Sequence, residues 1–413
     1  MISLLTAPFY LIPLIRSWRA TPFSPSTIFF TYSTLGSWFL SLLLDLKLFD
    51  EKNLIASWII TKESIPFTGF AIANFAIFLL TEIKFKKNKQ KHLLDTSKTT
   101  KIISAALILT LTEILITLYL YSGLDNWINA SYARVKIEDS RINLIFPLTL
   151  TVNVVILCAY CALTYSKTTK TQQTFLYATI ALQTFYLIGA GGRSILLLML
   201  VSLAIIKLKK VTKGSAIKIL FAFAGIIIAS GLMISARYEA QGATAQFENT
   251  IENVITASYT GLPFVDHIAL SAEYVKRNDL SYFDTYSSIW SFFIPRSVWQ
   301  EKPIQISRLV RDEFWGDSSG GIPPGFFGEG VIAFGWLGFL ITVPLYAAIL
   351  SFSNHYCTSP KTIHLQRLRT AAISTLVGFI LVRGGLDIGT YRVGLVIAAY
   401  VITERILYKK IRS

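Results

Sequence analysis

Residues 144–165 read LIFPLTLTVNVVILCAYCALTY and contain no Asp, Glu, Lys or Arg. At 1.5 Å per residue, a helix of this length is roughly 30 Å long, which is the thickness of the hydrocarbon core of a bilayer. A bilayer provides no water to satisfy backbone amides and carbonyls, so such a run crosses it as a helix. The stretch therefore predicts a helical membrane protein.

Similar apolar runs recur along the whole chain. The mean hydropathy is +0.53, with 53% hydrophobic and 15% charged residues, which is typical of a polytopic membrane protein. We predict an all-α membrane helix bundle of about eleven spans, formed by residues 1–413 as a single domain. The run at 2–15 is short and contains Pro8 and Pro13, so a partial or interfacial helix is its alternative. The expected spans lie near 2–15, 26–46, 66–83, 102–122, 144–165, 174–190, 194–207, 217–235, 326–352, 370–383 and 392–407.

The net charge of +15 reflects membrane topology. Its basic clusters fall in alternate gaps between the expected spans, which the positive-inside rule assigns to the cytoplasm. The gaps at 47–65, 123–143, 236–325 and 384–391 then face outward. Residues 237–329 hold seven Lys and Arg against twelve Asp and Glu, so we expect no nucleic-acid partner there. The basic clusters are Arg16 to Arg19, Lys84 to Lys91, Lys167 to Lys170, Lys207 to Lys218, Lys361 to Arg369 and Arg405 to Arg412.

Cysteine and histidine carry little chemical signal. Cys158 and Cys161 form a C-x-x-C with no neighbouring histidine or second pair, so we interpret them as small apolar helix residues. The large outer loop at 236–325 contains no cysteine, which excludes a disulfide within it. His267 is the one histidine expected on the outer side. No acidic cluster has convincing spacing for a metal ion.

Arginines at outer helix ends are the main functional signal, because topology disfavours them there. Arg193 follows Gly191 and Gly192 between two apolar runs, and Arg237 follows the run that ends before the large loop. Arg383 and Arg392 flank the gap at 384–391. A guanidinium group binds phosphate with two hydrogen bonds and stays charged at neutral pH, so a membrane-anchored phosphate or pyrophosphate suits these positions.

Two alternatives to this interpretation stay open. Arg193 alone is also compatible with a snorkelling residue at a helix end. The arginines are further compatible with a structural network that includes Asp387, Glu329 or anionic lipid head groups.

The second half of the large loop combines aromatic residues, arginines and Glu329. Aromatic rings there are compatible with an interfacial belt and with stacking on sugars. We expect Glu329 at the start of an otherwise apolar helix, between Gly328 and Gly330. It would either cap that helix or serve a ligand.

The ordered motifs of residues 185–395 resemble the bacterial oligosaccharide repeat-unit polymerases, the O-antigen polymerase family. The related O-antigen ligases are usually marked by a histidine motif late in the large loop, which this chain lacks. The motifs are Gly-Gly-Arg-Ser-x-Leu-Leu at 191–197, Ile-Pro-Arg-Ser-Val-Trp-x-x-Lys-Pro at 294–303, Pro-Gly-Phe-Phe-Gly-Glu-Gly-x-x-x-Phe-Gly-Trp-Leu-Gly at 324–338 and Val-Arg-Gly-Gly-Leu-Asp at 382–387.

The resemblance implies a multi-pass protein of the bacterial inner membrane, similar in fold to GT-C glycosyltransferases, with its active site facing the periplasm. It would join repeat units linked to undecaprenyl pyrophosphate, without a cofactor or metal. Membrane lipids and a chain-length regulator are the implied partners. The competing functions are an O-antigen ligase and a transporter of lipid-linked oligosaccharides.

The chemistry of that reaction assigns roles to two sets of residues. The leaving pyrophosphate needs positive charge, and the attacking hydroxyl needs a proton acceptor. For the acceptor we expect Glu329 first, then Asp387 and His267. For pyrophosphate binding we expect Arg193, Arg237, Arg296, Lys302 and Arg383.

Overall fold

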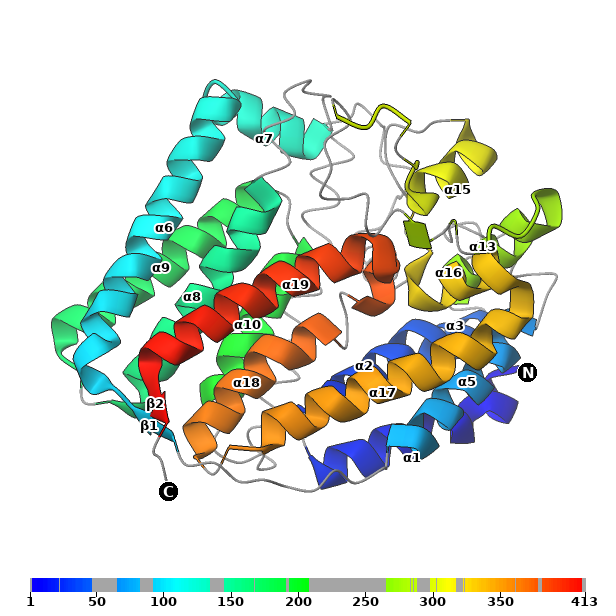
Figure 1. The fold of residues 1–413 in the computed structure, drawn as a ribbon, viewed down its shortest axis with the longest axis horizontal. Helices are drawn as coiled ribbons and strands as arrows, with labels where there is room; N and C mark the ends of the chain where they lie inside the picture. Colours follow the sequence, from blue (N-terminus) through cyan, green and yellow to red (C-terminus); the bar gives the residue numbers. More distant parts are fainter. Residues whose placement is uncertain are drawn as a thin grey trace. The chain divides into compact units, whose positions relative to one another are not determined.

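The computed structural model is helical, with one short two-stranded sheet among the residues it describes. Figure 1 shows the chain as a ribbon. The described residues are 2–21, 23–46, 65–81, 92–133, 145–166, 168–190, 193–207, 265–282, 284, 286–287, 298–301, 303–316, 322, 324–360, 362–377 and 381–410.

The chain divides into two compact units. Unit 1 comprises Met1–Lys87, Leu262–Tyr356 and Ile373–Gly394, and unit 2 comprises the remaining residues. In unit 1 lie α1 (Ile2–Ala20), α2 (Pro25–Ser33), the π-helical η1 (Thr34–Phe39), α3 (Leu40–Asp45), α5 (Ile65–Thr81), α13 (Val265–Arg277), α15 (Ile306–Trp315), α16 (Gly325–Phe334), the 3-10 turn η5 (Gly335–Leu337) and most of α17 (Gly338–Thr358). In unit 2 lie β1 (His92–Leu94), η3 (Thr96–Lys98), α6 (Thr99–Leu120), α7 (Leu124–Ala133), α8 (Ile145–Tyr165), α9 (Lys170–Gly189), α10 (Arg193–Lys207) and β2 (Tyr408–Lys410). The helices α18 (Ile363–Thr375) and α19 (Leu381–Leu407) contribute to both units.

Three helices in the described part of the chain are long and apolar enough to cross a membrane. They cover Thr99–Leu120, Leu148–Tyr165 and Gly325–Thr358, the last of which comprises α16, η5 and α17. They coincide with the apolar runs expected at 102–122, 144–165 and 326–352, and the crossing itself stays a prediction. Their presence supports a multi-pass membrane protein. The run at 217–235 lies outside the described residues, and the total of about eleven spans stays a prediction.

The outward loop expected at 384–391 is wrong, because α19 runs unbroken through it from Leu381 to Leu407. That gap was expected between the apolar runs at 370–383 and 392–407. Opposite charges four residues apart in the sequence, as at Arg383 and Asp387, are compatible with a helix.

An aromatic cluster in the core of unit 1 fixes the position of α16. Phe326 and Phe327 are 1% and 2% exposed. Their ring centroids lie 5.3 and 5.7 Å from that of Tyr346 on α17, and Phe327 also lies 5.3 Å from Phe70 on α5. Large buried rings in edge and tilted contacts stabilise a core beyond their area alone, so these residues hold the first turn of α16 against α5 and α17.

A polar contact reinforces the packing of α1 on α5 in unit 1. Asn74 of α5 is completely buried. Its amide donates to the carbonyl of Phe9 at 2.9 Å, and its oxygen accepts from the Ser33 hydroxyl at 2.7 Å. Because both ends of the buried amide are satisfied, Asn74 ties α1 and α2 to α5 without a desolvation penalty.

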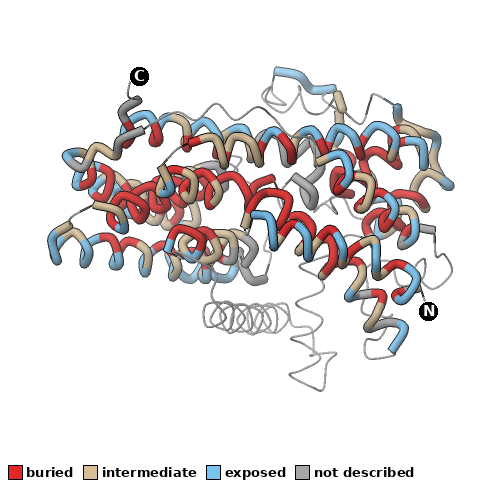
Figure 2. Tube along the Cα trace, turned by 90° about the horizontal axis from the view of Figure 1, so that it is seen from below, coloured by how far each residue is buried: buried red, intermediate tan, exposed pale blue. Residues whose placement is uncertain are grey.

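Unit 2 is built on α6, which packs against α8 and α9, while α10 packs on the same two helices. The Trp127 ring of α7 stacks on Tyr186 of α9, with ring centroids 5.4 Å apart. The same ring packs against Gly189, where an added Cβ would lie only 2.5 Å from the indole. Both α6 and α9 alternate buried and exposed positions, a pattern that Figure 2 shows along most of the helical tube.

The strands β1 and β2 close unit 2 at one end. They pair antiparallel, with His92 opposite Lys410 and Leu94 opposite Tyr408. The ring of His364 stacks on Tyr408 at 5.5 Å. Burial lowers the pKa of His364 and raises the pKa of Tyr408, so both rings are neutral at pH 7.

A buried ion pair links α18 to α19 within unit 2. Arg369 donates through Nη2 and Nε to the two carboxylate oxygens of Glu404, at 2.5 and 3.2 Å. The Tyr400 hydroxyl donates to the same carboxylate. This two-pronged geometry compensates the loss of hydration of both charges.

The junction of α16 and α17 depends on glycine. Gly335 has φ +60°, in the left-handed region, and ends α16. A Cβ at Gly338 would overlap the backbone carbonyl of Gly330, and a Cβ at Gly330 would lie 2.5 Å from Thr342. The backbones of α16 and α17 are therefore in direct contact at this junction.

Replacing Gly338 with Ala should destabilise the protein, because the clash is with backbone that moves only if a helix moves. We expect a net loss of about 1–3 kcal/mol. Gly394→Ala is the matched control, since a Cβ at Gly394 would meet no atom within 4 Å. The control should be neutral or stabilising by up to about 1 kcal/mol. Thermal unfolding of the purified proteins measures both, and equal midpoints would contradict the contact between Gly330 and Gly338.

Candidate functional site

The candidate site lies in unit 1, on α16. Glu329 is the fifth residue of this helix and is 1% exposed. The expectation that it stands at the helix start is wrong: α16 begins at Gly325, and its first turn holds no acidic residue. The interaction of a carboxylate with the helix dipole fades beyond the first turn, so helix capping does not explain Glu329.

Both glycines beside Glu329 are packed without spare room. A Cβ at Gly328 would lie 2.5 Å from the Ser271 hydroxyl oxygen on α13. Gly330 faces α17, as described above. Because glycines flank Glu329, α13 and α17 approach α16 closely, and this close packing buries the segment that carries Glu329.

The packing of α13 on α16 brings the helix of His267 to the helix of Glu329. His267 is 4% exposed and lies one turn before Ser271. The Ser271 hydroxyl donates to the His267 carbonyl at 2.8 Å. The structure thus places Glu329 and His267, two of the three predicted proton acceptors, on helices that are in contact. Each of the two residues also has interactions with other groups of the protein.

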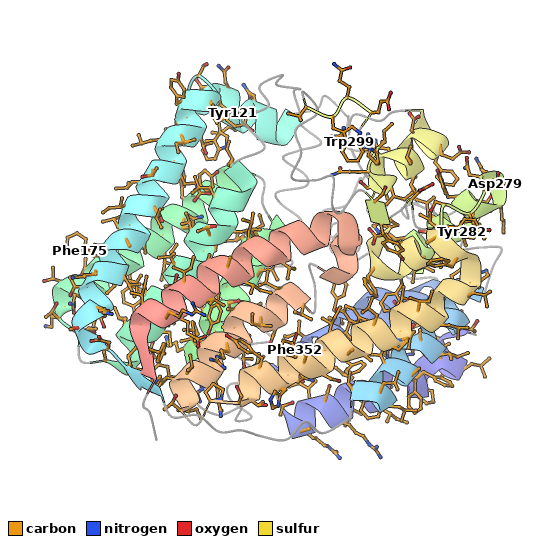
Figure 3. All side chains as sticks on the ribbon, in the orientation of Figure 1. Tyr121, Phe175, Asp279, Tyr282, Trp299 and Phe352 are labelled. Carbon is orange, nitrogen blue, oxygen red and sulfur yellow. The ribbon has the colours of Figure 1, made fainter. Side chains whose placement is uncertain are left out.

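The segment after α13 closes the far end of α16. The backbone N–H groups of Ser281 and Tyr282 donate to the carbonyls of Ile332 and Ala333 at 3.2 and 3.0 Å. Tyr282 adopts φ 44°, which is uncommon for a residue other than glycine and needs such hydrogen bonds to hold it. The helix end is therefore capped by this segment, beside which Figure 3 labels Tyr282.

Two tyrosine rings from the same segment lie against Phe334. The ring centroids of Tyr282 and Tyr286 are 6.4 and 6.5 Å from that of Phe334, the second in a stacked arrangement. Tyr282 is 58% exposed, so one ring of the group is open to a ligand. Exposed aromatic faces held rigidly by their neighbours are suited to stacking on the CH faces of sugars.

Tyr286 is electrostatically coupled to Glu329. Burial, together with the nearby negative charge of Glu329, raises the pKa of Tyr286 to about 12. Tyr286 therefore keeps its proton at neutral pH and is a hydrogen-bond donor there. The site combines a proton acceptor, a phenolic donor and an aromatic surface. Tyr282 and Tyr286 are absent from the residues expected on sequence grounds, although their spacing of four residues in a polar segment was a usable signal.

The predicted phosphate-binding residues are described only in part. Arg193 is the first residue of α10, in unit 2. Arg383 and Asp387 lie in the first two turns of α19, in the portion that belongs to unit 1. For these three residues the structure gives the backbone alone. Arg237, Arg296 and Lys302 lie outside the described residues. Pyrophosphate binding by this set stays a prediction.

One basic residue of the large loop has a structural role. Arg277 of α13 lies 3.4 Å from Glu273 and 3.8 Å from Glu313 of α15, and its guanidinium lies 4.8 Å from the ring centroid of Phe314. These contacts hold α15 against α13. Arg277 is thus engaged by protein groups in this structure.

Glu329 does not belong to a metal-binding cluster in the part of the chain that the structure describes. Among those residues, no group of three or more His, Cys, Asp or Glu could hold a metal. The metal independence implied by the family resemblance stays a prediction, because much of the large loop is outside those residues.

Comparison with known proteins adds no family to this picture. No protein-family model, no curated protein and no solved structure matches the chain. The functional interpretation therefore depends on the motifs of the sequence and on the geometry around Glu329.

Proposed function

We propose that the protein is a membrane glycosyltransferase that joins oligosaccharide repeat units carried on undecaprenyl pyrophosphate. One observation carries this proposal. Glu329 is the only ionisable residue of the motif at 324–338, and it lies buried, close enough to Tyr286 to raise the pKa of that phenol. A buried carboxylate beside a protonated phenol and an aromatic surface is suited to binding and deprotonating a sugar hydroxyl.

The glycines of the same motif have a different explanation. Gly328, Gly330 and Gly338 are needed for close helix contacts, and Gly335 is needed for its positive φ. Phe326 and Phe327 are needed for the aromatic core. Packing therefore accounts for most of the motif and leaves Glu329 as the residue whose presence calls for a chemical role.

The proposed reaction is a displacement at the anomeric carbon of the growing glycan. A hydroxyl of the incoming repeat unit forms the new glycosidic bond, its proton passes to Glu329, and undecaprenyl pyrophosphate leaves. Asp387 and His267 are the alternative proton acceptors. The negative charge on the leaving pyrophosphate is stabilised by the arginines at 193, 237, 296 and 383, with Lys302.

A polymerase is preferred to a ligase because the large loop lacks the late histidine motif of the ligases. Transport of lipid-linked oligosaccharides is the second candidate function, and one observation favours it. Glu113 is completely buried inside α6, one of the three helices able to cross a membrane. Ionisable groups at membrane depth often mark transport pathways.

The products left after deletion of the gene separate these functions. We expect surface polysaccharide on a gel to show the lipid core with a single repeat unit, as lost polymerisation requires. Bare core accompanied by lipid-linked polymer outside the inner membrane would instead indicate a ligase. Bare core with repeat units retained on the cytoplasmic side would indicate a transporter.

Exchange of Arg193 or Arg237 for lysine tests the binding of pyrophosphate. Lysine keeps the positive charge but cannot form the two parallel hydrogen bonds of a guanidinium group, so each variant should lose most polymerisation at normal protein levels. Alanine should abolish it. Full-length polymer from both lysine variants would show that a point charge is sufficient, which fits a snorkelling role.

Glu329→Gln tests the proton acceptor in the purified protein, with synthetic lipid-linked repeat units as substrate and EDTA present. The amide keeps the size of the side chain but does not take a proton, so the rate should fall by roughly 100- to 10,000-fold. Glu301→Gln is the control, because Glu301 is an exposed carboxylate of the large loop that precedes α16, and it should keep the wild-type rate.

Two readouts make this result interpretable. Size-exclusion chromatography checks that the Glu329→Gln protein is folded, and a comparison of the pH–rate profiles of the two proteins shows whether ionisation of Glu329 contributes to the rate. A folded variant that turns over at the wild-type rate would remove Glu329 from the reaction and pass its role to Asp387 or His267.

A further inference from the structure

A second buried carboxylate, Glu113, lies at the centre of unit 2 and has no part in the proposed reaction. It is 0% exposed. The Thr149 hydroxyl of α8 donates to its Oε1, the Gln183 amide nitrogen of α9 donates to its Oε2 at 3.1 Å, and the Tyr186 hydroxyl is a third partner. Side chains from α8 and α9 thus converge on a carboxylate of α6.

The group lies well inside the apolar part of unit 2. Glu113 is seven residues before the end of α6 at Leu120, which corresponds to roughly 10 Å along the helix axis. Thr149 is four residues after the start of α8, and Gln183 is six residues before the end of α9. The three side chains therefore meet at a similar depth, beneath one end of the three helices.

The charge of an ionised Glu113 is not balanced by the protein around it. Within the described ranges no Lys or Arg pairs with Glu113, whose partners are a hydroxyl, an amide and a phenol. This contrasts with Glu404, which is paired with Arg369 at 2.5 Å in the same unit. An isolated carboxylate in an apolar interior is strongly destabilising unless a positive charge accompanies it.

Unused oxygen atoms lie on each of the three helices that meet at this carboxylate. The Oε1 atom of Gln183, Oγ1 of Thr110 and Oδ1 of Asn153 are all buried and have no hydrogen-bond partner in the part of the chain that the structure covers. Gln183 Oε1 belongs to the amide that contacts Glu113. Thr110 is one turn before Glu113 on the same face of α6, and Asn153 is one turn after Thr149 on α8.

These oxygens distinguish between the ways of neutralising Glu113. A proton on the carboxylate would remove its charge but would supply a single hydrogen, leaving most of the free acceptors unsatisfied. A cation would satisfy the carboxylate and several neutral oxygens together. The donor set is oxygen only, which suits a hard cation, and it carries one negative charge, which balances a monovalent ion. A divalent ion would leave an uncompensated positive charge in the apolar interior.

We propose that unit 2 contains a binding site for a monovalent metal cation, formed by Glu113, Gln183, Thr110, Asn153 and Thr149. The bound ion neutralises the buried carboxylate and links α6, α8 and α9. Sodium is the probe, because a hard monovalent ion suits a set of oxygen ligands. The site is independent of the glycosyltransferase reaction proposed above.

Sodium binding to the purified full-length protein tests this proposal directly. We expect radioactive sodium to bind saturably, with about one ion per chain, in buffers of constant ionic strength with choline as the replacement cation. Sodium should also raise the midpoint of thermal unfolding with the same concentration dependence, because a ligand that binds only the folded state stabilises it.

Variants locate the site. Glu113→Gln removes the charge but keeps an oxygen and should weaken sodium binding by roughly 100-fold or more. Gln183→Leu removes a neutral ligand and should weaken it by roughly 10-fold. Asp125→Asn is the matched control, because Asp125 is an exposed carboxylate on α7 of the same unit, and it should bind sodium like the wild type.

Absence of saturable sodium binding to the wild-type protein would overturn the proposal. Glu113 would then be a protonated group that joins three helices by hydrogen bonds. Undiminished binding by the folded Glu113→Gln protein would overturn it as well, by placing the ion elsewhere. Neither outcome depends on polymerase activity, so the two proposals fail separately.

Discussion

Burial of carboxylates in apolar surroundings is the constraint on which the rest of this structure depends. The described residues solve it in three ways. Glu404 is paired with Arg369, Glu113 is held by neutral donors from α8 and α9, and Glu329 lies where its charge acts on Tyr286. Since hydration of a charge is lost on burial, each solution has to supply a partner. The first solution is structural, whereas the second and third suit ligands.

Glycine contacts determine where the third carboxylate lies. The backbone contact between Gly330 and Gly338 folds α16 against α17, and the fit of Gly328 against Ser271 brings α13 to its other side. Neither contact tolerates a Cβ. The aromatic residues that precede them, Phe326 and Phe327, supply the burial that holds the helix in place. A motif that reads as one functional signature is therefore mostly a packing signature around one reactive residue.

Hydropathy predicted the helices of this protein well, because the length of an apolar run determines whether it can cross a bilayer. The run at 144–165 became α8, Ile145–Tyr165, and the run at 102–122 became α6, Thr99–Leu120. The segment at 384–391 was predicted wrongly because it separates two apolar runs in the sequence, whereas α19 continues through it.

The candidate sites were less predictable because they depend on tertiary contacts. Glu329 lies in the second turn because α16 begins at Gly325. The sequence alone did not predict that start, although Pro323 and Pro324 precede it. Tyr286 joins Glu329 only because the segment after α13 caps α16. Glu113 was visible as the one acidic residue in its run. Its importance depends on its contacts with Gln183 and Thr149. These residues lie on other helices, and the sequence does not show that they pack at the level of Glu113.

The pairing of β1 with β2 has a consequence for how the chain is made. β1 ends at Leu94, before the first helix of unit 2, whereas β2 begins at Tyr408. During synthesis, α6, α8, α9 and α10 therefore leave the ribosome long before the strand that closes their unit. Until then the edge of β1 has no strand beside it, and the Arg369 side chain still awaits Glu404. Completion of unit 2 therefore waits for the synthesis of β2, and a chain interrupted before β2 would lack both the strand that pairs with β1 and, if interrupted before Glu404, the carboxylate that pairs with Arg369.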